Sequence, residues 1–461
     1  MRVLWITNIL FPEALAKLTG RSDFRSSGGW MLGAAKALMS RKEIRLFVAS
    51  VSPLVEKLTR IEGDKIVYYL IPYGKGNLKY NTNYQLYWKQ ISSEVVPDVV
   101  HIHGTEFSHG YAYMKECGCE NVVVSIQGLT SAVSKYYTSG ISRFDILKNI
   151  TLRDLLRGSI LADKRRFKNR SKYEAEMLKM AKHVIGRTSW DRSMLWAINP
   201  DAEYHFCNET LRAEFYDGAM WDFKKCNKYT IFLSQASYPI KGLHQLLKAM
   251  PLILRQYPET HIRVAGEDIT ESKTINEKLR LSGYGLYIKR LIKKLGLNGR
   301  VEFIGNLNAE QMKNEYLRSN VFVCPSSIEN SPNSLCEAQI LGVPCVASYV
   351  GGVADIMSGN EENLYRFEDV STLAIKVCQI FERYNSNVCQ MSKRAYLRHD
   401  INLNTQRLLD IYAKISVASE KNNLISESVN LLRKCVVLCD YYCHLLLTTF
   451  VLSQDNVLGH K

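Results

Sequence analysis

Two glutamates, Glu329 and Glu337, are separated by seven residues in a segment that also carries a predicted strand and a predicted helix start. The apolar run VFVCPS (321–326) precedes them and is typical of a buried strand. Ser334 and Glu337 have the spacing of a capping box, so we expect Ser334 to be the N-cap of a helix. A helix N-terminus attracts an anion such as a diphosphate, and carboxylates accept hydrogen bonds from hydroxyls. Together these groups suit a nucleotide-activated sugar.

Each glutamate alone also has a structural interpretation. Glu337 could serve only to satisfy a backbone N–H of its own helix, and Glu329 could be a solvated loop acid. Their joint position near a strand end, beside the free N–H groups expected for residues 333–336, favours ligand recognition. Both structural interpretations stay open.

The elements that would position this pair follow from the hydrophobic pattern. Continuous apolar strands separated by helical patterns are typical of parallel sheets covered on both faces. Because two such sets follow one another, we expect an α/β protein with two Rossmann-like, doubly wound domains that face a central cleft. The predicted strands are 3–7, 44–50, 66–71, 98–104, 122–128, 183–188 and 203–207, then 229–234, 261–266, 300–305, 321–326 and 344–348.

The domain boundaries follow from a change in composition. The polar, charged segment 217–228 has little periodicity and is the predicted linker. It separates a first domain, 1–222, from a second domain, 223–395. We expect a helix over 396–416 and an appended helical tail over 417–461. Ligands of such folds bind beyond the carboxyl ends of the strands, which places the site in the cleft between the domains.

The bulk properties are those of a globular protein with an anionic partner. The chain has 461 residues and a formal net charge of +15. That charge favours nucleotide phosphates, a nucleic acid or an anionic membrane, without choosing among them. The N-terminus has no signal-peptide cleavage site, and the longest apolar stretch, 435–452, is interrupted by Asp440 and His444. We therefore expect no membrane-spanning helix.

The cysteines indicate a reducing compartment. Twelve cysteines are scattered along the chain, and the spacing of Cys117 and Cys119 is too close for a zinc ribbon. We expect a cytoplasmic protein without a disulfide framework. Cys435, Cys439 and Cys443 share one helical face, which indicates apolar packing more than a metal site.

One segment departs from the βα pattern. Residues 151–182 are rich in Lys and Arg and place Leu155, Leu156, Ile160 and Leu161 among them. A basic amphipathic helix can lie on the anionic inner face of a plasma membrane. A solvated helix face is the alternative.

The stretch Val321–Met357 resembles the donor-binding segment of retaining GT-B glycosyltransferases of family 4, the group 1 glycosyl transferases. The resemblance is carried by Glu329 and Glu337, by Gly342-Val343-Pro344, and by Gly351-Gly352. It extends over about 1–415. It implies a GT-B fold in which the helix over 396–416 crosses back onto the N-terminal domain.

The resemblance implies that the C-terminal domain binds the nucleotide diphosphate sugar. Glu337 would bind the ribose, and Glu329 would contact the donor sugar at the reacting end. Lys241, in the family's Lys-Gly pair, would neutralise the diphosphate, which a point charge suits. The remaining implied contacts are the backbone of Asn333, Ser334 and Leu335 to sugar and diphosphate, and Gly305 to the nucleobase.

The N-terminal domain would bind the acceptor. Gly28 and Gly29 follow the first strand, where paired glycines let the backbone approach a phosphate or a sugar; a plain loop is the alternative. His103 matches the family's histidine-containing loop, and a buried structural histidine is an equal alternative. We expect Gly28, Gly29, His103 and Gln127 to face the cleft.

Two positions depart from the family pattern. Gln235 stands where an arginine often helps Lys241 with the diphosphate, so one charge is missing. Gln127 stands where a histidine is often found near the reacting carbon, and a glutamine is no base near neutral pH. Front-face retaining chemistry tolerates this change, because the leaving diphosphate can take the acceptor's proton. The candidate catalytic residues are therefore Glu329, Gln127 and His103.

We predict a retaining glycosyltransferase that moves a sugar from a nucleotide diphosphate sugar to a hydroxyl of a growing glycan. The segment 184–212 resembles enzymes of bacterial surface-polysaccharide assembly, which implies capsule, exopolysaccharide or lipopolysaccharide synthesis and a lipid-linked acceptor. We expect no cofactor, no essential metal and no nucleic-acid partner. The alternatives are a nucleotide-sugar epimerase or phosphorylase on this fold, and a non-catalytic basic binding module on a degenerate one.

Overall fold

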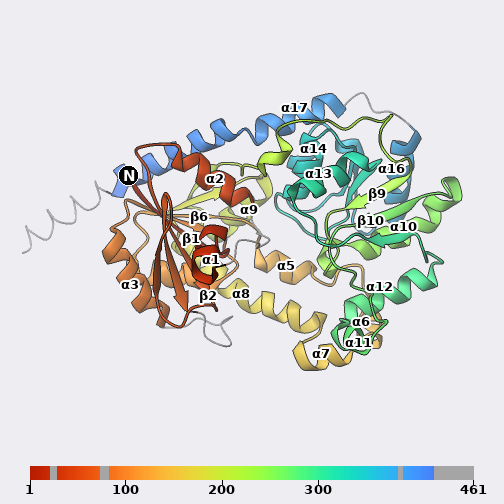
Figure 1. Cartoon of the computed structure of the whole chain (residues 1–461), viewed down its shortest axis with the longest axis horizontal. Coiled ribbons are helices and arrows are strands. Elements are labelled where there is room, and N and C mark those ends of the chain that lie inside the picture. Colours follow the sequence, from red (N-terminus) through yellow and green to blue (C-terminus); the bar gives the residue numbers. More distant parts are fainter. Residues whose placement is uncertain (21–28, 73–82, 383–387, 420–461) are drawn as a thin grey trace, which may run out of the picture.

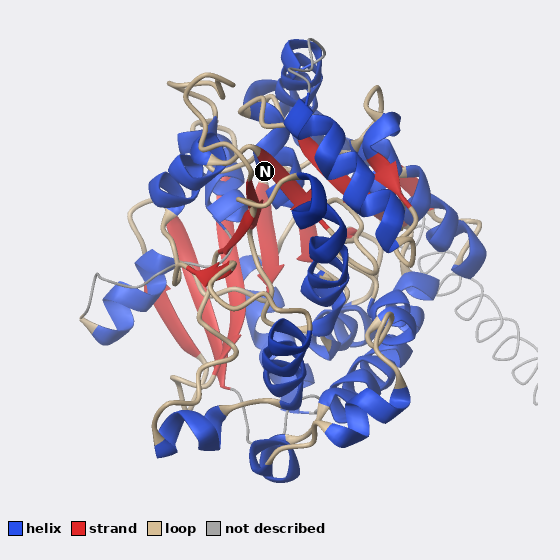
Figure 2. Ribbon diagram, turned by 90° about the vertical axis from the view of Figure 1, so that its right-hand side faces the viewer, coloured by secondary structure: helices blue, strands red, loops and turns tan. Residues whose placement is uncertain are grey.

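The protein consists of two α/β domains, each built around one sheet (Figure 1). The computed structural model describes residues 1–20, 29–72, 83–382 and 388–419. Figure 2, turned by 90° from Figure 1, shows the strands enclosed by helices. The predicted fold class, two doubly wound sheets with a helical C-terminal region, is confirmed.

The N-terminal sheet has the strand order β3-β4-β2-β1-β5-β6-β7-β8, and its strands are parallel except for the antiparallel pair β3–β4. All predicted strands of this half are present. Strand β3 was not predicted, because its four residues, TRIE, are half exposed and polar. Its strands are β1 Arg2–Thr7, β2 Arg45–Ser52, β3 Thr59–Glu62, β4 Ile66–Pro72, β5 Val99–His103, β6 Val122–Ser125, β7 His183–Gly186 and β8 Glu203–Phe206.

Helices cover both faces of this sheet. Local sequence determines where several of these helices begin. In α9, for example, a capping box formed by Thr188 and Asp191 stabilises the first turn. The helices are α1 Pro12–Thr19, α2 Gly29–Met39, α3 Asn83–Val95, α4 Ser108–Cys117, α5 Thr130–Tyr136, α6 Arg143–Lys148, α7 Leu152–Arg157, α8 Ile160–Met180 and α9 Ser189–Ile198, and a 3-10 turn η1 spans Ala213–Phe215.

The C-terminal sheet has the order β11-β10-β9-β12-β13-β14 and is parallel throughout. Its strands are β9 Thr230–Leu233, β10 His261–Val264, β11 Val301–Phe303, β12 Val321–Cys324, β13 Cys345–Ser348 and β14 Leu364–Tyr365. The helices are α10 Leu243–Gln256, α11 Ile275–Arg280, α12 Gly283–Lys294, α13 Ala309–Arg318, α14 Asn333–Ile340, α15 Val353–Ile356, α16 Val370–Glu382 and α17 Val388–Arg398, with 3-10 turns η2 Pro239–Lys241 and η3 Glu361–Asn363.

The topology fixes where a ligand can bind. In the C-terminal sheet the strand order reverses between β9 and β12, and the loops after these two strands diverge to opposite faces of the sheet. Such a switch point leaves a crevice at the carboxyl ends of the strands. The loop after β9 leads to Lys241, and the loop after β12 leads to Glu329.

The chain crosses back to the N-terminal domain after α17. A helix over 401–419 lies on the face of the first sheet, drawn in blue in Figure 1. The Tyr412 hydroxyl accepts a hydrogen bond from Trp5 Nε1 at 2.9 Å and lies 2.6 Å from Nδ1 of His101. The tail over 420–461, with Cys435, Cys439 and Cys443, lies outside the described residues.

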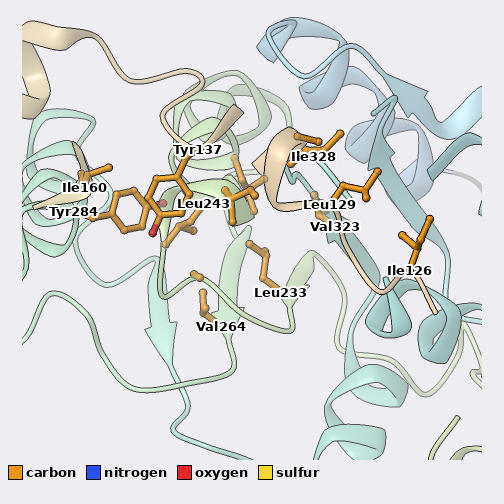
Figure 3. Close-up of a cluster of buried hydrophobic side chains, with 14 of the residues drawn as sticks. Ile126, Leu129, Tyr137, Ile160, Leu233, Leu243, Val264, Tyr284, Val323 and Ile328 are labelled. Atoms are coloured by element: carbon orange, nitrogen blue, oxygen red, sulfur yellow. The ribbon is translucent and has the colours of Figure 1, made fainter. Parts of the chain in front are cut away.

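Buried apolar side chains join the two domains into one body. The cluster in Figure 3 contains Leu129 and Tyr137 from the first domain and Leu233 and Ile328 from the second. Since these side chains are almost fully buried, the interface resembles a domain core. Among the described helices, none combines the length and the apolar character that a membrane crossing requires.

Candidate active site

The C-terminal switch point holds a pocket of about 370 Å³ with mostly polar walls. This donor pocket is enclosed by the loops after β9 and β12 and by the first turn of α14. It brings together several residues that lie far apart in sequence, most of them expected from the sequence. Its polar lining includes Arg212, Gln235, Lys241, Ser326, Glu329, Asn333, Ser334 and Glu337.

Lys241 and Glu329 form an ion pair at the mouth of the donor pocket. Lys241 Nζ lies 2.6 Å from Glu329 Oε1, and the same oxygen accepts a hydrogen bond from Ser326 Oγ at 2.8 Å. Burial lowers the pKa of Lys241, but the charge and hydrogen bond of Glu329 together with other nearby groups outweigh burial, so the pKa lies above the ordinary value and the ammonium stays charged.

Gly242 makes this pairing possible. Its φ of 72° lies in the left-handed region, and a Cβ there would stand 1.6 Å from the carbonyl oxygen of Pro325. Only glycine allows so close an approach of the two loops. Gly242 therefore lets Lys241 lie close to the loop after β12 that carries Glu329.

Glu337 does not have the predicted helix-capping role. The helix α14 begins two residues earlier than expected, with Pro332 at the N-cap and no side-chain cap. The Glu337 carboxylate instead binds Arg212 through two parallel bonds, Nε to Oε1 and Nη2 to Oε2, both 2.8 Å long. The capping-box prediction for Ser334 and Glu337 is wrong, because a bidentate guanidinium outcompetes a single backbone N–H for the carboxylate.

Burial and charge act in opposite directions on Glu337. Burial raises its pKa, the hydrogen bonds and charge of Arg212 lower it, and the net shift is upward. An ionised carboxylate has about four lone-pair positions, of which Arg212 fills two. The remaining positions leave room for hydroxyl donors.

The first turn of α14 leaves backbone donors at the pocket. Asn333 and Ser334 are its first residues, so their N–H groups have no partner inside the helix. The N–H of Leu335 already bonds the carbonyl of Pro332 at 3.0 Å, and the Leu335 side chain is fully buried. The set of free donors is therefore smaller than the sequence predicted for residues 333–336.

Gly351 and Gly352 support the loop that carries Glu329. A Cβ at Gly351 would stand 1.9 Å from the carbonyl oxygen of Glu329, and one at Gly352 would stand 2.4 Å from that of Asn330. The N–H of Gly352 also donates to the Glu329 carbonyl at 3.1 Å. The glycine pair thus packs against the backbone of the Glu329 loop and holds it in position.

A second pocket, of about 380 Å³, lies between the domains and meets the donor pocket at Lys241 and Glu329. We call it the acceptor-side pocket. Its walls are mainly apolar and aromatic, and they come from both domains. Its lining includes Glu106, Gln127, Leu129, Val133, Tyr137, Phe167, Trp190, Tyr238, Ile240 and Ile328.

Glu106 is an ionisable group of this pocket that the sequence reasoning missed. Burial raises its pKa to about 7, and the nearby charge of Glu174 acts in the same direction. Asn8 Nδ2 donates to its Oε2 at 3.3 Å. Its position just beyond the end of β5 is the signal that could have revealed it, because strand ends line the cleft.

Gln127 and His103 occupy different places. Gln127 lines the acceptor-side pocket and also a smaller neighbouring pocket that holds His103, Arg187 and Glu209. Both ring nitrogens of His103 lack a hydrogen-bond partner among the described residues, and burial holds its pKa well below the ordinary value. The ring stacks on His101 with centroids 3.7 Å apart. His103 is therefore neutral and does not line the pocket of Glu329.

The remaining expected residues are partly outside the pockets. Gly29 opens α2, and a Cβ there would stand 2.9 Å from Cγ of Arg212, so it packs against the arginine that holds Glu337. Gly28 lies outside the described residues. Gly305 follows β11 and accepts a hydrogen bond from the N–H of Gly266 at 2.8 Å, away from the lining of the donor pocket.

Arg212 supplies a charge that the sequence reasoning considered missing. Gln235 lines the donor pocket without a charge, but Arg212 faces the same space from the segment after β8. The sequence could not show this, because Arg212 precedes Glu337 by 125 residues. The cations that face this pocket are thus the side chains of Lys241 and Arg212.

The second half of the chain is similar to a known protein family. Residues 220–398 match the family model described as Glycosyl transferases group 1. An uncharacterised glycosyltransferase of Methanocaldococcus jannaschii is 31% identical over 28% of this chain and 29% of its own length. The phosphatidylinositol N-acetylglucosaminyltransferase gpi3 subunit of Schizosaccharomyces pombe is 23% identical over 45% of this chain and 42% of its own length. The chain thus spans less than half the length of these curated relatives.

Solved structures match over almost the whole chain. Sucrose-phosphate synthase from Thermosynechococcus elongatus has a TM-score of 0.63 and 16% identity, covering 91% of this chain and all of its own. Anabaena HepE in complex with UDP has a TM-score of 0.60 and 14% identity, covering 90% of this chain and all of its own. Residues 220–398 therefore resemble the group 1 glycosyl transferases, and the chain as a whole has the GT-B fold. The resemblance to glycosyltransferases is thereby confirmed.

Proposed function

We propose that the protein is a retaining glycosyltransferase of family 4 that moves a sugar from a nucleotide diphosphate sugar to a hydroxyl of a growing glycan. The single observation that carries this proposal is the donor pocket. Two cations, two carboxylates and an uncapped helix N-terminus meet there at the switch point of a parallel sheet. That set matches the diphosphate, the ribose and the sugar of one ligand.

The donor would lie along the pocket in a fixed direction. Its diphosphate binds Lys241 and the N–H groups of Asn333 and Ser334, which carry positive charge toward it. The ribose hydroxyls donate to the two open positions of Glu337, and Arg212 stays on the other two. The sugar then points toward Glu329 and the acceptor-side pocket.

Catalysis in this arrangement rests on charge stabilisation at the leaving group. The bond from the anomeric carbon to the diphosphate breaks while the acceptor oxygen attacks from the same face. The leaving diphosphate takes the acceptor's proton, so no base is required at Gln127. Lys241 and the α14 N-terminus are already aligned with the developing charge, which lowers the barrier without reorganisation.

Glu106 would position the acceptor hydroxyl. It lines the same pocket as Glu329 but belongs to the other domain. In its ionised form it accepts a hydrogen bond from an attacking hydroxyl and orients it. Trp190, Tyr137 and Phe167 offer ring faces and apolar surface for the rest of the acceptor.

We further propose a lipid-linked acceptor, in assembly of a bacterial capsule, exopolysaccharide or lipopolysaccharide, at the cytoplasmic face of a membrane. The supporting observation is a group of exposed apolar side chains on α6 and α7, two helices that lie at the lower edge of Figure 1. Leu155 and Leu156 are 73% and 77% exposed, and Phe144 and Leu147 project from α6 in the same way. The same two helices carry Arg143, Lys148, Arg153 and Arg157.

This surface refines the expectation of a single basic helix over 151–182. The chain turns at Gly158, whose φ is 99°, and so divides into α7 and α8. Glu174 of α8 is buried and accepts hydrogen bonds from the N–H groups of Thr130 and Ser131. The C-terminal half of α8 therefore packs against the domain, and we assign the membrane contact to α6–α7. Exposed leucines on helices that also carry Lys and Arg match an anionic bilayer.

The donor part of the proposal is tested by a thermal-shift screen of nucleotide sugars. Binding raises the melting temperature by mass action, so one donor should stand apart from its neighbours. The same mixtures without acceptor are then checked for an epimerised sugar. A shift with no transfer to any hydroxyl and with an epimer formed would favour the epimerase, and no shift with any donor would favour the non-catalytic module.

The membrane part is tested by co-sedimentation with vesicles. The protein should bind vesicles of phosphatidylglycerol and phosphatidylcholine, and not vesicles of phosphatidylcholine alone. Replacing Leu155 and Leu156 by Ser should weaken binding at least about tenfold, because each buried leucine contributes about 1.5–3 kcal/mol. Leu86→Ser is the control, since Leu86 is 70% exposed on α3. Equal binding of all three proteins would contradict this placement.

A further inference from the structure

Three metal-ligand side chains converge at the edge of the N-terminal sheet. His183 lies at the start of β7, and Glu203 and His205 lie on the edge strand β8. The parallel register pairs His183 with Glu203 and Ile185 with His205, so alternation places all three on one face. This cluster is remote from the two pockets, and nothing in the proposed function uses it.

The distances suit a shared ion. His183 Nδ1 lies 3.1 Å from His205 Nε2, and Glu203 Oε2 lies 3.5 Å from His183 Nδ1. Two nitrogen ligands of a tetrahedral zinc ion are about 3.3 Å apart, as follows from zinc–nitrogen bonds of about 2.0–2.1 Å. Each of the three residues offers one ligand atom, and these atoms lie within 4.8 Å of one another.

The two histidine rings are held in place by their surroundings, and the cluster is open to solvent on one side. The side chains of His183 and His205 are 11% and 9% exposed, so the sheet and its covering helix hold both rings. The Glu203 side chain is 41% exposed, which opens the cluster to solvent on one side. An ion can therefore enter from the edge of the sheet without unfolding it.

We propose that His183, Glu203 and His205 bind one divalent transition-metal ion, with Zn²⁺ as the best match. Two imidazoles and one carboxylate suit zinc, nickel or cobalt, whereas magnesium prefers oxygen ligands alone. Three protein ligands leave the fourth position to water.

Lys414 acts as a built-in competitor for this site. It comes from the helix over 401–419, and its Nζ contacts Glu203 Oε1. The ammonium thus supplies positive charge where the ion would supply it. Its side chain is 58% exposed, so it can turn into solvent when the ion binds. The remaining nearby cation, Lys182, is paired with Glu120.

The ion would brace the segment that supports the donor pocket. It links β8 to β7, and the chain after β8 leads directly to Glu209 and Arg212. Glu209 receives a hydrogen bond from Asn333 of α14 at 3.0 Å. The proposal concerns binding and stability, and it holds whatever reaction the donor pocket performs.

The test is calorimetry of the full chain with Zn²⁺, Ni²⁺ and Mg²⁺. We expect one saturable site for zinc and nickel and none for magnesium. His205→Ala should weaken this site on the order of 100-fold, since even the outer shell of a metal site is worth about 10–100-fold. His261→Ala is the matched control, because His261 lies at the start of β10 and contacts Thr230 instead.

Lys414→Met is expected to increase the affinity for zinc, and a misfolded variant would not show such an increase. Removing the competing ammonium should tighten zinc binding about tenfold. Thermal melting in chelator checks that each variant keeps its fold. The proposal is overturned if the wild type and Lys414→Met both lack a saturable site, or if His205→Ala binds zinc as tightly as the wild type, which would assign the zinc to cysteines.

Discussion

The two pockets that meet at Lys241 and Glu329 have opposite characters. The donor pocket is walled by ion pairs, with Lys241 on Glu329 and Arg212 on Glu337. The acceptor-side pocket is lined mainly by aromatic and apolar side chains. It also contains Glu106, whose pKa is raised to about 7. The difference indicates that one side recognises its ligand mainly by charge and the other mainly by shape.

The largest effect that distinguishes the two pockets is expected for a substitution at Lys241. Lys241→Met removes a cation aligned with the leaving diphosphate, so we expect kcat/KM to fall about 100- to 1000-fold. The KM for the acceptor should change much less, because Lys241 is only one of many side chains that line the acceptor-side pocket and methionine has a similar length. Steady-state kinetics with both substrates varied measure the two effects.

A fall in acceptor affinity equal to the fall in rate would contradict a division of labour between the pockets. Lys248→Met serves as the control. Lys248 lies on α10 close to Lys241 in sequence, but its Nζ donates to the carbonyl of Gly140, outside the donor pocket.

The acceptor side is tested at Glu106 through pH. If the ionised form orients the acceptor, kcat/KM should rise with pH through about 7, following its pKa. Glu106→Gln should lower kcat/KM on the order of 100-fold above this pH and remove the titration. A pH profile unchanged in Glu106→Gln would exclude this role.

The same group predicts how stability depends on pH. The folded pKa of Glu106 is raised from 4.5 to about 7, so the folded state binds its proton more tightly than the unfolded state. The free energy of unfolding should therefore fall as pH rises from about 4.5 to about 7. Denaturant unfolding of Glu106→Gln at pH 5 and pH 8 should show a smaller fall than the wild type.

Arg212 sharpens the donor side of the comparison. Arg212→Met removes the two bonds to Glu337 and the second cation, so we expect donor affinity to fall about tenfold, or about 1.4 kcal/mol. Arg263→Met is the control. Arg263 forms a similar pair with Glu315, with Nε to Oε2 at 2.8 Å, outside the donor pocket. Equal loss of donor affinity in both variants would mean that Arg212 acts only through stability.

The smallest effect is expected at the support of the Glu329 loop. Gly351→Ala places a Cβ against the Glu329 carbonyl, and such overpacking costs about 1–3 kcal/mol of stability. Gly296→Ala is the control, because Gly296 also has a positive φ, of 69°, but open space around a Cβ. Only Gly351→Ala should also weaken donor binding; a similar loss in Gly296→Ala would assign the effect to backbone strain.

Much of the fold was predictable because its signals are local. Every predicted strand is present, since continuous apolar runs such as 321–326 have few other solutions. The convergence of Lys241, Glu329 and Glu337 followed from the rule that strand ends line one crevice. Strand β14, Leu364–Tyr365, was missed because two residues carry no periodicity.

Some residues that contact the site residues were not predictable, because they lie far from them in the sequence. Arg212 displaces the capping role of Glu337, and the local spacing of Ser334 and Glu337 gave no sign of it. The pKa of Glu106 is raised by burial, which depends on tertiary packing. Local patterns therefore identify where the chemistry lies, while tertiary contacts decide which charge each residue carries.

The central claim is that the donor pocket binds a nucleotide diphosphate sugar through Glu337. The most direct measurement is calorimetry of the best donor with the wild type, Glu337→Ala and Glu315→Ala. Glu315 is the matched control, because it is buried, paired with an arginine and outside the pocket. We predict that Glu337→Ala abolishes donor binding while Glu315→Ala retains it. Unchanged affinity in Glu337→Ala would contradict the account.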